Sequence, residues 1–225
     1  MQGDFCSICG ERLMSFGPAV GEDAAICGMC RRARPEFERA AAFGSYDGTL
    51  RELLHLLKYE GVRPVAGILG GLLASAIDTC SLNGLKLTVI PVPLYRRRRG
   101  ERGFNQAELL ARAALRQLRS SWPLLTDCLV RTRETASQTG LTRHQRRANV
   151  RGAFKVKDRS QVAGKDILLI DDVLTTGTTA AECARVLKRS GAGKVYVATV
   201  ARVLKGEGFQ VQPHPYTAVA GGRAS

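Results

Sequence analysis

The segment Ile167-Leu-Leu-Ile-Asp171-Asp172-Val-Leu-Thr175-Thr176-Gly177-Thr178-Thr179 decides the fold. Its apolar start is typical of a strand buried on both faces of a sheet, and two adjacent aspartates follow at the carboxyl end of that strand. A turn rich in threonine and glycine comes next and leads into a predicted helix. Free backbone N–H groups, hydroxyls and the helix dipole converge at such a turn, and together they favour a phosphate monoester.

The acidic pair distinguishes this turn from a loop that holds a nucleoside triphosphate. No Lys-Ser/Thr follows the glycine, so the Walker pattern is absent. Carboxylates repel a phosphate unless they face hydroxyls or a metal ion, and a ribose 5-phosphate offers its 2- and 3-hydroxyls to them. The predicted contacts are Asp171, Asp172, Thr175, Thr176, Gly177, Thr178 and Thr179. The alternative is an ordinary strand–turn–helix with a capped helix start.

Outward from this segment, strand patterns alternate with helical patterns. The predicted strands are Ala41–Tyr46, Lys86–Val92, Cys128–Arg131, Ala153–Val156, Asp166–Ile170 and Lys194–Val200. The predicted helices are Arg31–Arg39, Thr49–Tyr59, Val65–Ile77, Asn105–Leu118, Arg143–Val150 and Thr178–Arg189. This order predicts an α/β protein whose mostly parallel sheet carries helices on both faces. The glycines of Val65–Ile77 follow no strand, so they indicate close helix packing rather than a nucleotide loop.

Four of the seven cysteines form Cys6-Ser-Ile-Cys9 and Cys27-Gly-Met-Cys30, in the pattern C-x2-C-x17-C-x2-C. An odd total argues against the disulfide framework of a secreted protein, and the doubled spacing predicts a structural zinc site. Four sulfurs leave no open coordination position, so the metal would fold the segment without performing chemistry. Free thiols or a redox pair are the alternatives. The remaining three cysteines, Cys80, Cys128 and Cys183, are expected in the core.

The charge of the 225 residues is strongly basic, with a formal net charge of +14. Hydrophobic content of 44% and charged content of 24% exclude wholesale disorder. The first 40 residues hold five arginines and six acidic residues, so the excess lies beyond them and favours nucleic acid, phosphate esters or pyrophosphate. No apolar stretch is long enough to cross a bilayer and no secretory signal opens the chain, so we expect a soluble, cytoplasmic protein without membrane insertion.

Longer patterns carry a resemblance to known families. The aspartate segment resembles the signature of type I phosphoribosyltransferases for 5-phosphoribosyl 1-pyrophosphate (PRPP). The run Ile90-Pro-Val-Pro-Leu-Tyr-Arg-Arg-Arg-Arg-Gly-Glu-Arg-Gly-Phe-Asn-Gln106 resembles the hallmark of the ComF family of competence proteins, which includes GntX-like proteins. Leu57-Lys-Tyr-Glu-Gly61, the pattern Arg131-x-Arg133-x-Thr135-x-x-Gln138-x-x-Leu141-x-Arg143-x-x-Arg146-x-x-Asn149 and the four cysteines are similar to that family too.

The resemblance implies a type I phosphoribosyltransferase fold with an N-terminal zinc ribbon. The chain is expected to divide into a zinc-ribbon domain over 1–35 and a phosphoribosyltransferase-type domain over 36–204. A loose tail is expected over 205–225, outside the resemblance, because glycine and proline recur there without periodicity. The resemblance implies a pyrophosphate loop at Pro91, Val92, Pro93, Leu94 and Tyr95. It also implies that Arg131–Asn149 is a flexible loop that closes over the site, with catalytic candidates Arg143, Arg146 and Arg147. Mg²⁺ and guanidinium groups would offset the charge of the departing pyrophosphate.

Two functions from different classes stay open. The first is an enzyme linked to DNA uptake that binds PRPP or a ribose-5-phosphate group with Mg²⁺ and transfers phosphoribosyl to a nitrogen acceptor. The second is a non-catalytic accessory protein of natural transformation that binds single-stranded DNA beside a competence helicase. Its candidate nucleic-acid contacts are Arg96, Arg97, Arg98, Arg99 and Arg102. The alternative for this run is a solvated basic face.

Overall fold

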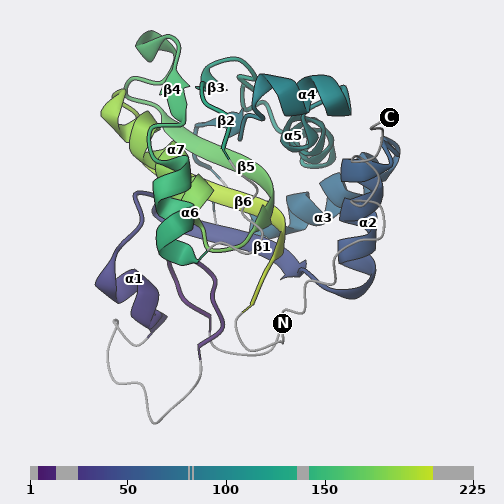
Figure 1. Ribbon diagram of the computed structural model, residues 1–225, viewed down its shortest axis with the longest axis horizontal. Coiled ribbons are helices and arrows are strands. Elements are labelled where there is room, and N and C mark those ends of the chain that lie inside the picture. The colour runs from purple at the N-terminus through teal and green to yellow at the C-terminus, as the bar shows by residue number, and fades with distance from the viewer. Residues whose placement is uncertain (1–4, 14–24, 81, 83, 136–141, 205–225) are drawn as a thin grey trace, which may run out of the picture.

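The computed structural model describes residues 5–13, 25–80, 82, 84–135 and 142–204. Its central sheet has four parallel strands in the order β1-β6-β5-β2. These strands are β1 (Arg39–Ser45), β2 (Leu87–Pro91), β5 (Asp166–Leu174) and β6 (Val195–Arg202). A second, antiparallel sheet pairs β3 (Leu129–Arg131) with β4 (Phe154–Val156). Figure 1 shows this small sheet above the central one.

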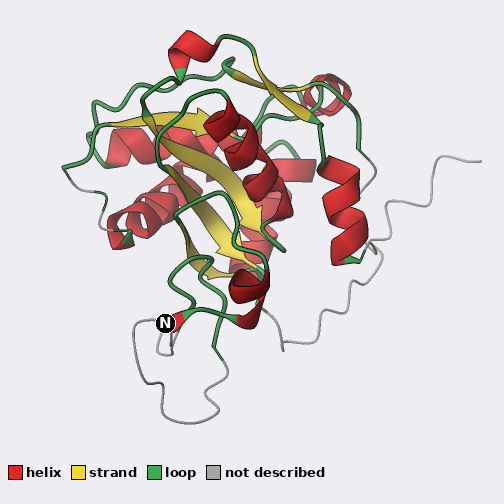
Figure 2. Cartoon of the chain, turned by 90° about the vertical axis from the view of Figure 1, so that its left-hand side faces the viewer, coloured by secondary structure: helices red, strands yellow, loops and turns green. Residues whose placement is uncertain are grey.

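Helices cover both faces of the central sheet (Figures 1 and 2). They are α1 (Gly28–Arg32), α2 (Gly48–Tyr59), α3 (Val65–Thr79), α4 (Arg96–Arg102), α5 (Gln106–Gln117), α6 (Arg143–Val150) and α7 (Thr178–Arg189). A short 3₁₀ helix, η2, spans Arg159–Gln161. The predicted α/β architecture is therefore confirmed. Within the described ranges, no helix is long and apolar enough to cross a membrane.

Strand β5 separates two hydrophobic clusters. Ile167 and Leu169 face the cluster that includes α7 and the small antiparallel sheet. Leu168 and Ile170 face the cluster built from α2, α3 and α5. Because side chains alternate along a strand and both faces are covered, the strand has to be apolar without interruption. All four side chains are completely buried.

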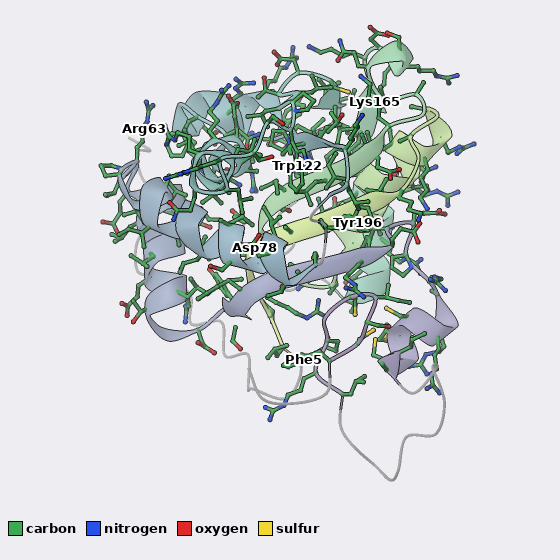
Figure 3. The ribbon with its side chains drawn as sticks, turned by 180° about the vertical axis from the view of Figure 1, so that it is seen from behind. Phe5, Arg63, Asp78, Trp122, Lys165 and Tyr196 are labelled. Carbon is green, nitrogen blue, oxygen red and sulfur yellow. The ribbon has the colours of Figure 1, made fainter. Side chains whose placement is uncertain are left out.

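The molecule seen from behind shows the side of the central sheet that α3 covers (Figure 3). Asp78 of α3 lies on this side, and so do Trp122 and Tyr196, which pack against the cluster of α2, α3 and α5.

Two boundaries differ from the sequence prediction. The helix expected over Arg31–Arg39 is wrong, since α1 ends at Arg32 and β1 begins at Arg39. Pro35 explains the difference, because its ring disfavours helical geometry at the preceding residue and removes a backbone donor. Strand β5 also continues past Ile170 to Leu174, and its pairing with β6 includes Asp171 opposite Thr199. The aspartates are therefore part of the strand rather than of the turn.

The packing of α3 against α5 confirms close helix contact at one glycine of α3, Gly70, and not at Gly67 or Gly71. A Cβ added to Gly70 would lie 2.3 Å from Cβ of Ala113 and 3.0 Å from its backbone carbon. A Cβ added to the adjacent Gly71 would meet nothing within 4 Å. One glycine of the pair is thus required by the neighbouring backbone, and the other is not.

We expect Gly70→Ala to lower the free energy of unfolding by about 1–3 kcal/mol, because overpacking forces two helices apart. Gly71→Ala is the matched control, and it should raise that free energy by about 0.5–1 kcal/mol, since alanine restricts the unfolded chain and favours helix. Urea unfolding followed by circular dichroism measures both. Equal effects of the two substitutions would contradict the packing of α3 on α5.

Candidate functional site

The turn between β5 and α7 lies at the carboxyl edge of the central sheet. Gly177 caps the start of α7 with a φ of +72°, a left-handed conformation that other residues adopt only with strain. The hydroxyls of Thr176 and Thr178 lie 2.7 Å apart and form a hydrogen bond. The first backbone N–H groups of a helix have no partner within it, so a helix start such as this one favours an anion.

A cleft of about 870 Å³ opens beside this turn. Its walls include residues 175–178 of the turn and the arginines Arg146, Arg147 and Arg151 at α6. The other wall comes from the cysteine segment, including Met29 and Cys30. The cleft is lined by the turn between β5 and α7 and not by Asp171 or Asp172.

Asp171 and Asp172 are held differently. The Oδ1 atom of Asp171 accepts a hydrogen bond from the backbone N–H of Asp172 at 2.9 Å. Burial and the neighbouring Asp172 carboxylate raise the pKa of Asp171 to about 7. Asp172 is only 5% exposed, and its Oδ2 atom lies 2.7 Å from Nζ of Lys58 on α2. The two acids are adjacent in sequence, but only Asp172 is engaged by a direct cationic partner.

Sequence reasoning missed Lys58 and Arg131 as members of this site. Burial opposes the charge on Lys58, but the carboxylate of Asp172 outweighs it and raises the pKa of the lysine. Arg131 ends β3 near Asp171, where burial lowers its pKa, and its side chain donates to Thr135 and lies over the Phe154 ring. Both residues belong to the ComF-like patterns quoted above, which were the signal for them, but no local chemistry indicated a role.

The predicted pyrophosphate loop, Pro91–Tyr95, runs from the end of β2 to the start of α4. Asn105 fixes this loop, because its Nδ2 donates to the carbonyl oxygen of Val92 at 3.1 Å while its Oδ1 caps α5 by accepting from the N–H of Ala107 at 3.0 Å. Gly103 ends α4 with a φ of +76°. The Gly-Phe-Asn-Gln part of the hallmark therefore holds the geometry of the loop.

The arginine run divides into two groups. Arg96, Arg97, Arg98 and Arg99 are exposed on α4. Arg97 is paired with Glu101 at 2.9 Å and with Glu134 at 3.4 Å, so part of this charge is offset. Arg102 is only half-exposed, donates to Gln106 at 2.6 Å and lies over the Tyr59 ring. Burial lowers the pKa of Arg102, against the opposing attraction of Asp172. Arg102 thus belongs with the acids rather than with the exposed run.

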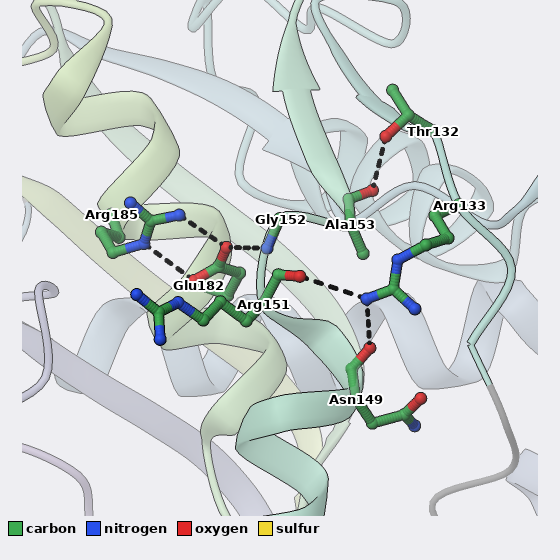
Figure 4. A network of polar contacts seen from close by, with 8 residues as sticks. All are labelled: Thr132, Arg133, Asn149, Arg151, Gly152, Ala153, Glu182 and Arg185. Carbon is green, nitrogen blue, oxygen red and sulfur yellow. Dashed lines mark hydrogen bonds and ion pairs between the residues drawn. The ribbon is translucent and has the colours of Figure 1, made fainter.

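Helix α6 forms over Arg143–Val150, as predicted. Thr142 and Gln145 cap its start with reciprocal hydrogen bonds. At its end, Nη2 of Arg133 donates to the carbonyl oxygens of Asn149 at 2.9 Å and Arg151 at 3.1 Å (Figure 4). The helix is therefore anchored while Arg146 and Arg147 face the cleft. Residues 136–141 of the expected flexible loop and the side chain of Arg143 lie outside the described residues.

Glu182 joins α7 to the segment after α6. It accepts hydrogen bonds from the N–H of Gly152 at 2.7 Å and from Arg185 (Figure 4). Burial opposes ionisation of Glu182, but these donors outweigh it and lower the pKa of the carboxyl. The charged carboxylate therefore links the basic helix to the helix that begins at the phosphate turn.

The four predicted metal ligands, Cys6, Cys9, Cys27 and Cys30, come together, with their sulfur atoms all within 4.8 Å of one another. The Sγ atoms of Cys9 and Cys27 lie 3.7 Å apart. Tetrahedral zinc with Zn–S bonds of about 2.3 Å requires sulfurs about 3.8 Å apart, so the donor set and spacing fit zinc. The other three cysteines are buried in the core, as predicted.

Arg202 attaches the cysteine segment to the sheet. It is 6% exposed at the end of β6, where it donates to the carbonyl oxygen of Cys9 and to Oε2 of Glu11 at 2.9 Å. Arg202 pairs with Leu174, the last residue of β5 before the phosphate turn. One buried guanidinium thus connects the metal-binding segment to the strand that carries the site.

Several known proteins are similar to most of this chain. The family model of the phosphoribosyl transferase domain matches residues 105–213. DNA utilization protein YhgH of Escherichia coli O157:H7 is 36% identical over 181 residues, 79% of this chain and 78% of that protein. Competence protein F of Haemophilus influenzae is 32% identical over 202 residues, 88% of this chain and 84% of that protein. The chain belongs to the ComF family.

Other ComF relatives and solved structures are more distant. Competence protein ComFC of Bacillus subtilis is 28% identical over 189 residues, covering 84% of this chain and 73% of that protein. A hypoxanthine phosphoribosyltransferase structure from Trypanosoma cruzi aligns with a TM-score of 0.37 at 16% identity, over 66% of this chain and 72% of that chain. The expected ComF membership and the type I phosphoribosyltransferase-like fold are confirmed.

We expect native mass spectrometry to find one zinc ion per chain, and Cys9→Ser to lose it during dialysis against a chelator, because three sulfurs bind the metal less well than four. Thermal unfolding of the variant should shift downward by several degrees, since the metal stabilises the folded segment. Cys80→Ser is the control, because that cysteine is buried outside the cluster and its variant should keep the zinc. Full zinc retention by Cys9→Ser would contradict the four-sulfur site.

Proposed function

We propose that this ComF-family chain binds PRPP, or another ribose 5-phosphate, at the turn between β5 and α7. The observation that carries the proposal is the junction itself: two carboxylates near the carboxyl end of the buried strand β5 are followed, after Val173 and Leu174, by a threonine-rich turn that opens α7. The turn suits the dianionic phosphate, because the N-terminus of α7 supplies N–H groups and a favourable dipole. The acids suit the ribose hydroxyls, which donate hydrogen bonds to carboxylates.

Magnesium is part of this proposal. Carboxylate oxygens are the protein ligands that Mg²⁺ prefers, and the edge of the sheet offers those of Asp171 and Asp172. The ion would lessen the repulsion between the acids and the pyrophosphate of PRPP and stabilise the charge that develops as pyrophosphate leaves. The chain itself contributes the fixed loop Pro91–Tyr95 beside β5 and the anchored basic helix α6.

The proposed reaction is transfer of the phosphoribosyl group to a nitrogen acceptor, in a role linked to DNA uptake. Arg143, Arg146 and Arg147 are the proposed groups that offset the negative charge, and α6 carries all three. Helices α2 and α3 rise beside the acids, so they are the proposed walls of the acceptor pocket. We further propose that the chain works in the cytoplasm, with a zinc-ribbon domain over 1–35, the phosphoribosyltransferase-type domain over 36–204 and a loose tail over 205–225.

Calorimetric titration of the native protein with PRPP and Mg²⁺ tests this function. We expect binding, and we expect Thr176→Val to weaken it by about 10-fold, because the isosteric change removes one hydroxyl donor to a charged phosphate. Thr79→Val, at the exposed end of α3, removes a hydroxyl of the same kind near the start of β1, at the opposite edge of the sheet, and should leave the affinity unchanged. Absence of any binding by the native protein would overturn the proposal.

A second candidate function is binding of single-stranded DNA by the exposed face of α4, in concert with a competence helicase. The supporting observation is that Arg96, Arg97, Arg98 and Arg99 all reach solvent beside the proposed pyrophosphate loop. Exposed guanidinium groups bind phosphate backbones and release counterions, so such binding weakens as salt rises. The pairs of Arg97 with Glu101 and Glu134 reduce the charge available to a strand.

Retention of a labelled oligonucleotide at increasing salt tests the second function. The fourfold change Arg96–Arg99→Ala should lower the affinity for the oligonucleotide by at least 10-fold at low salt. It should also flatten the salt dependence of that affinity, because fewer phosphate contacts release fewer counterions. A charge-matched control replaces Arg116, Arg119, Lys155 and Lys157, which are exposed elsewhere. Equal losses in both variants would show attraction by net charge alone and exclude α4 as the DNA site.

A further inference from the structure

The ion pair between Lys58 and Asp172 links α2 to the acids. The Nζ and Oδ2 atoms are 2.7 Å apart, and the two side chains are 15% and 7% exposed. Both charges are therefore largely removed from water, where each needs its partner. In the free protein, the ammonium of Lys58 is paired with the carboxylate of Asp172, which the proposed function assigns to the ribose diol and Mg²⁺. A ligand that uses Asp172 has to displace Lys58 or share the acid with it.

The groups around this pair show where the ammonium could go. Asp171 and Tyr46 also attract Lys58, and Arg102 approaches Asp172 from the end of α4. Arg102 lies 5.7 Å from the centre of the Tyr59 ring, and Arg63 lies 5.1 Å from the centre of the Phe104 ring. Residues of α2 and of the loop after it thus contact the segment that directly follows Pro91–Tyr95. Lys58 directly precedes Tyr59, so it belongs to the part of α2 that makes this contact.

We propose that Lys58 is an exchangeable counter-ion, which neutralises Asp172 in the free protein and moves to the pyrophosphate of PRPP when the ribose binds. This inference rests on the proposed function and deepens it, because it assigns the preference for a pyrophosphate-bearing ribose to one residue. A ribose 5-phosphate alone would take the Asp172 carboxylate without offering Lys58 a new anion in its place, which is unfavourable for a charge largely removed from water. PRPP provides the anion in the same molecule, so the exchange costs far less.

The exchange has a consequence that simple repulsion does not. Two anions that bind side by side normally weaken each other. If pyrophosphate draws Lys58 away from Asp172, it frees the acid for the diol, and ribose 5-phosphate then binds more tightly. By linkage, ribose 5-phosphate strengthens the binding of pyrophosphate by the same factor. Positive coupling between these two anions is therefore the signature of the counter-ion exchange.

The test is calorimetry with PRPP, ribose 5-phosphate and inorganic pyrophosphate, each with the same excess of Mg²⁺. For the native protein, we expect saturating pyrophosphate to increase the affinity for ribose 5-phosphate by at least 5-fold. In Lys58→Met, PRPP should bind at least 10-fold more weakly, ribose 5-phosphate as well as before or better, and the coupling should vanish. Lys58→Arg keeps the charge and should keep positive coupling. Because Mg²⁺ is present throughout, coupling through the metal alone would survive in Lys58→Met.

A matched control is Lys188→Met, which removes the lysine of another 2.8 Å ion pair, that with Glu38 at the far end of α7. It should change none of the three affinities. If Lys58→Met weakens PRPP and ribose 5-phosphate equally, or if its coupling persists, Lys58 is only structural and the inference is overturned. Should that variant fail to fold, absent or negative coupling in the native protein overturns it as well. Failure of the native protein to bind any of the ligands rejects the proposed function instead, and the inference with it.

Discussion

Burial of β5 on both faces is the constraint on which the rest of the structure depends. Residues Ile167–Ile170 are completely buried, so this strand forms the centre of the sheet. A strand in such a position can present polar groups only where it leaves the core, at its carboxyl end. Parallel pairing places the end of β2 beside it on one side and the end of β6 on the other. The acids, the phosphate turn and the proline-rich loop therefore share one edge.

Two buried cations connect more distant parts of the chain to this edge. Lys58 ties α2 to Asp172, and Arg202 ties the cysteine segment to the end of the sheet. A buried charge is unfavourable unless its partner is correctly placed, so these two ion pairs fix where α2 and the cysteine segment lie against the sheet. The helix beside the acids and the metal-binding segment are thereby held in register with β5.

The ComF-like hallmark shows why a continuous motif is not a continuous site. Arg99 and Arg102 are three residues apart in one short helix, yet Arg99 faces solvent near Glu108 while Arg102 turns toward Tyr59 and Asp172. Residues three apart lie on the same face of a helix, so the difference comes from their place along α4: Arg102 is its last residue, where the chain turns at Gly103. Similarly, Arg133 anchors the end of α6 through backbone carbonyls, although its surroundings in sequence suggest another ligand-binding cation.

Sequence alone determined the features that depend on local chemistry and periodicity. The strand–turn–helix at Asp171–Thr178, the alternation of elements and the four-cysteine spacing are all readable because neighbouring residues create them. The sequence prediction of a helix over Arg31–Arg39 was wrong, because it followed the charged pattern of the segment and neglected the effect of Pro35. Only the tertiary structure decided that Lys58 neutralises Asp172 and that Arg202 contacts Cys9 and Glu11. Those partners come from distant elements, and only the packing of helices and strands around β5 brings the buried charges together.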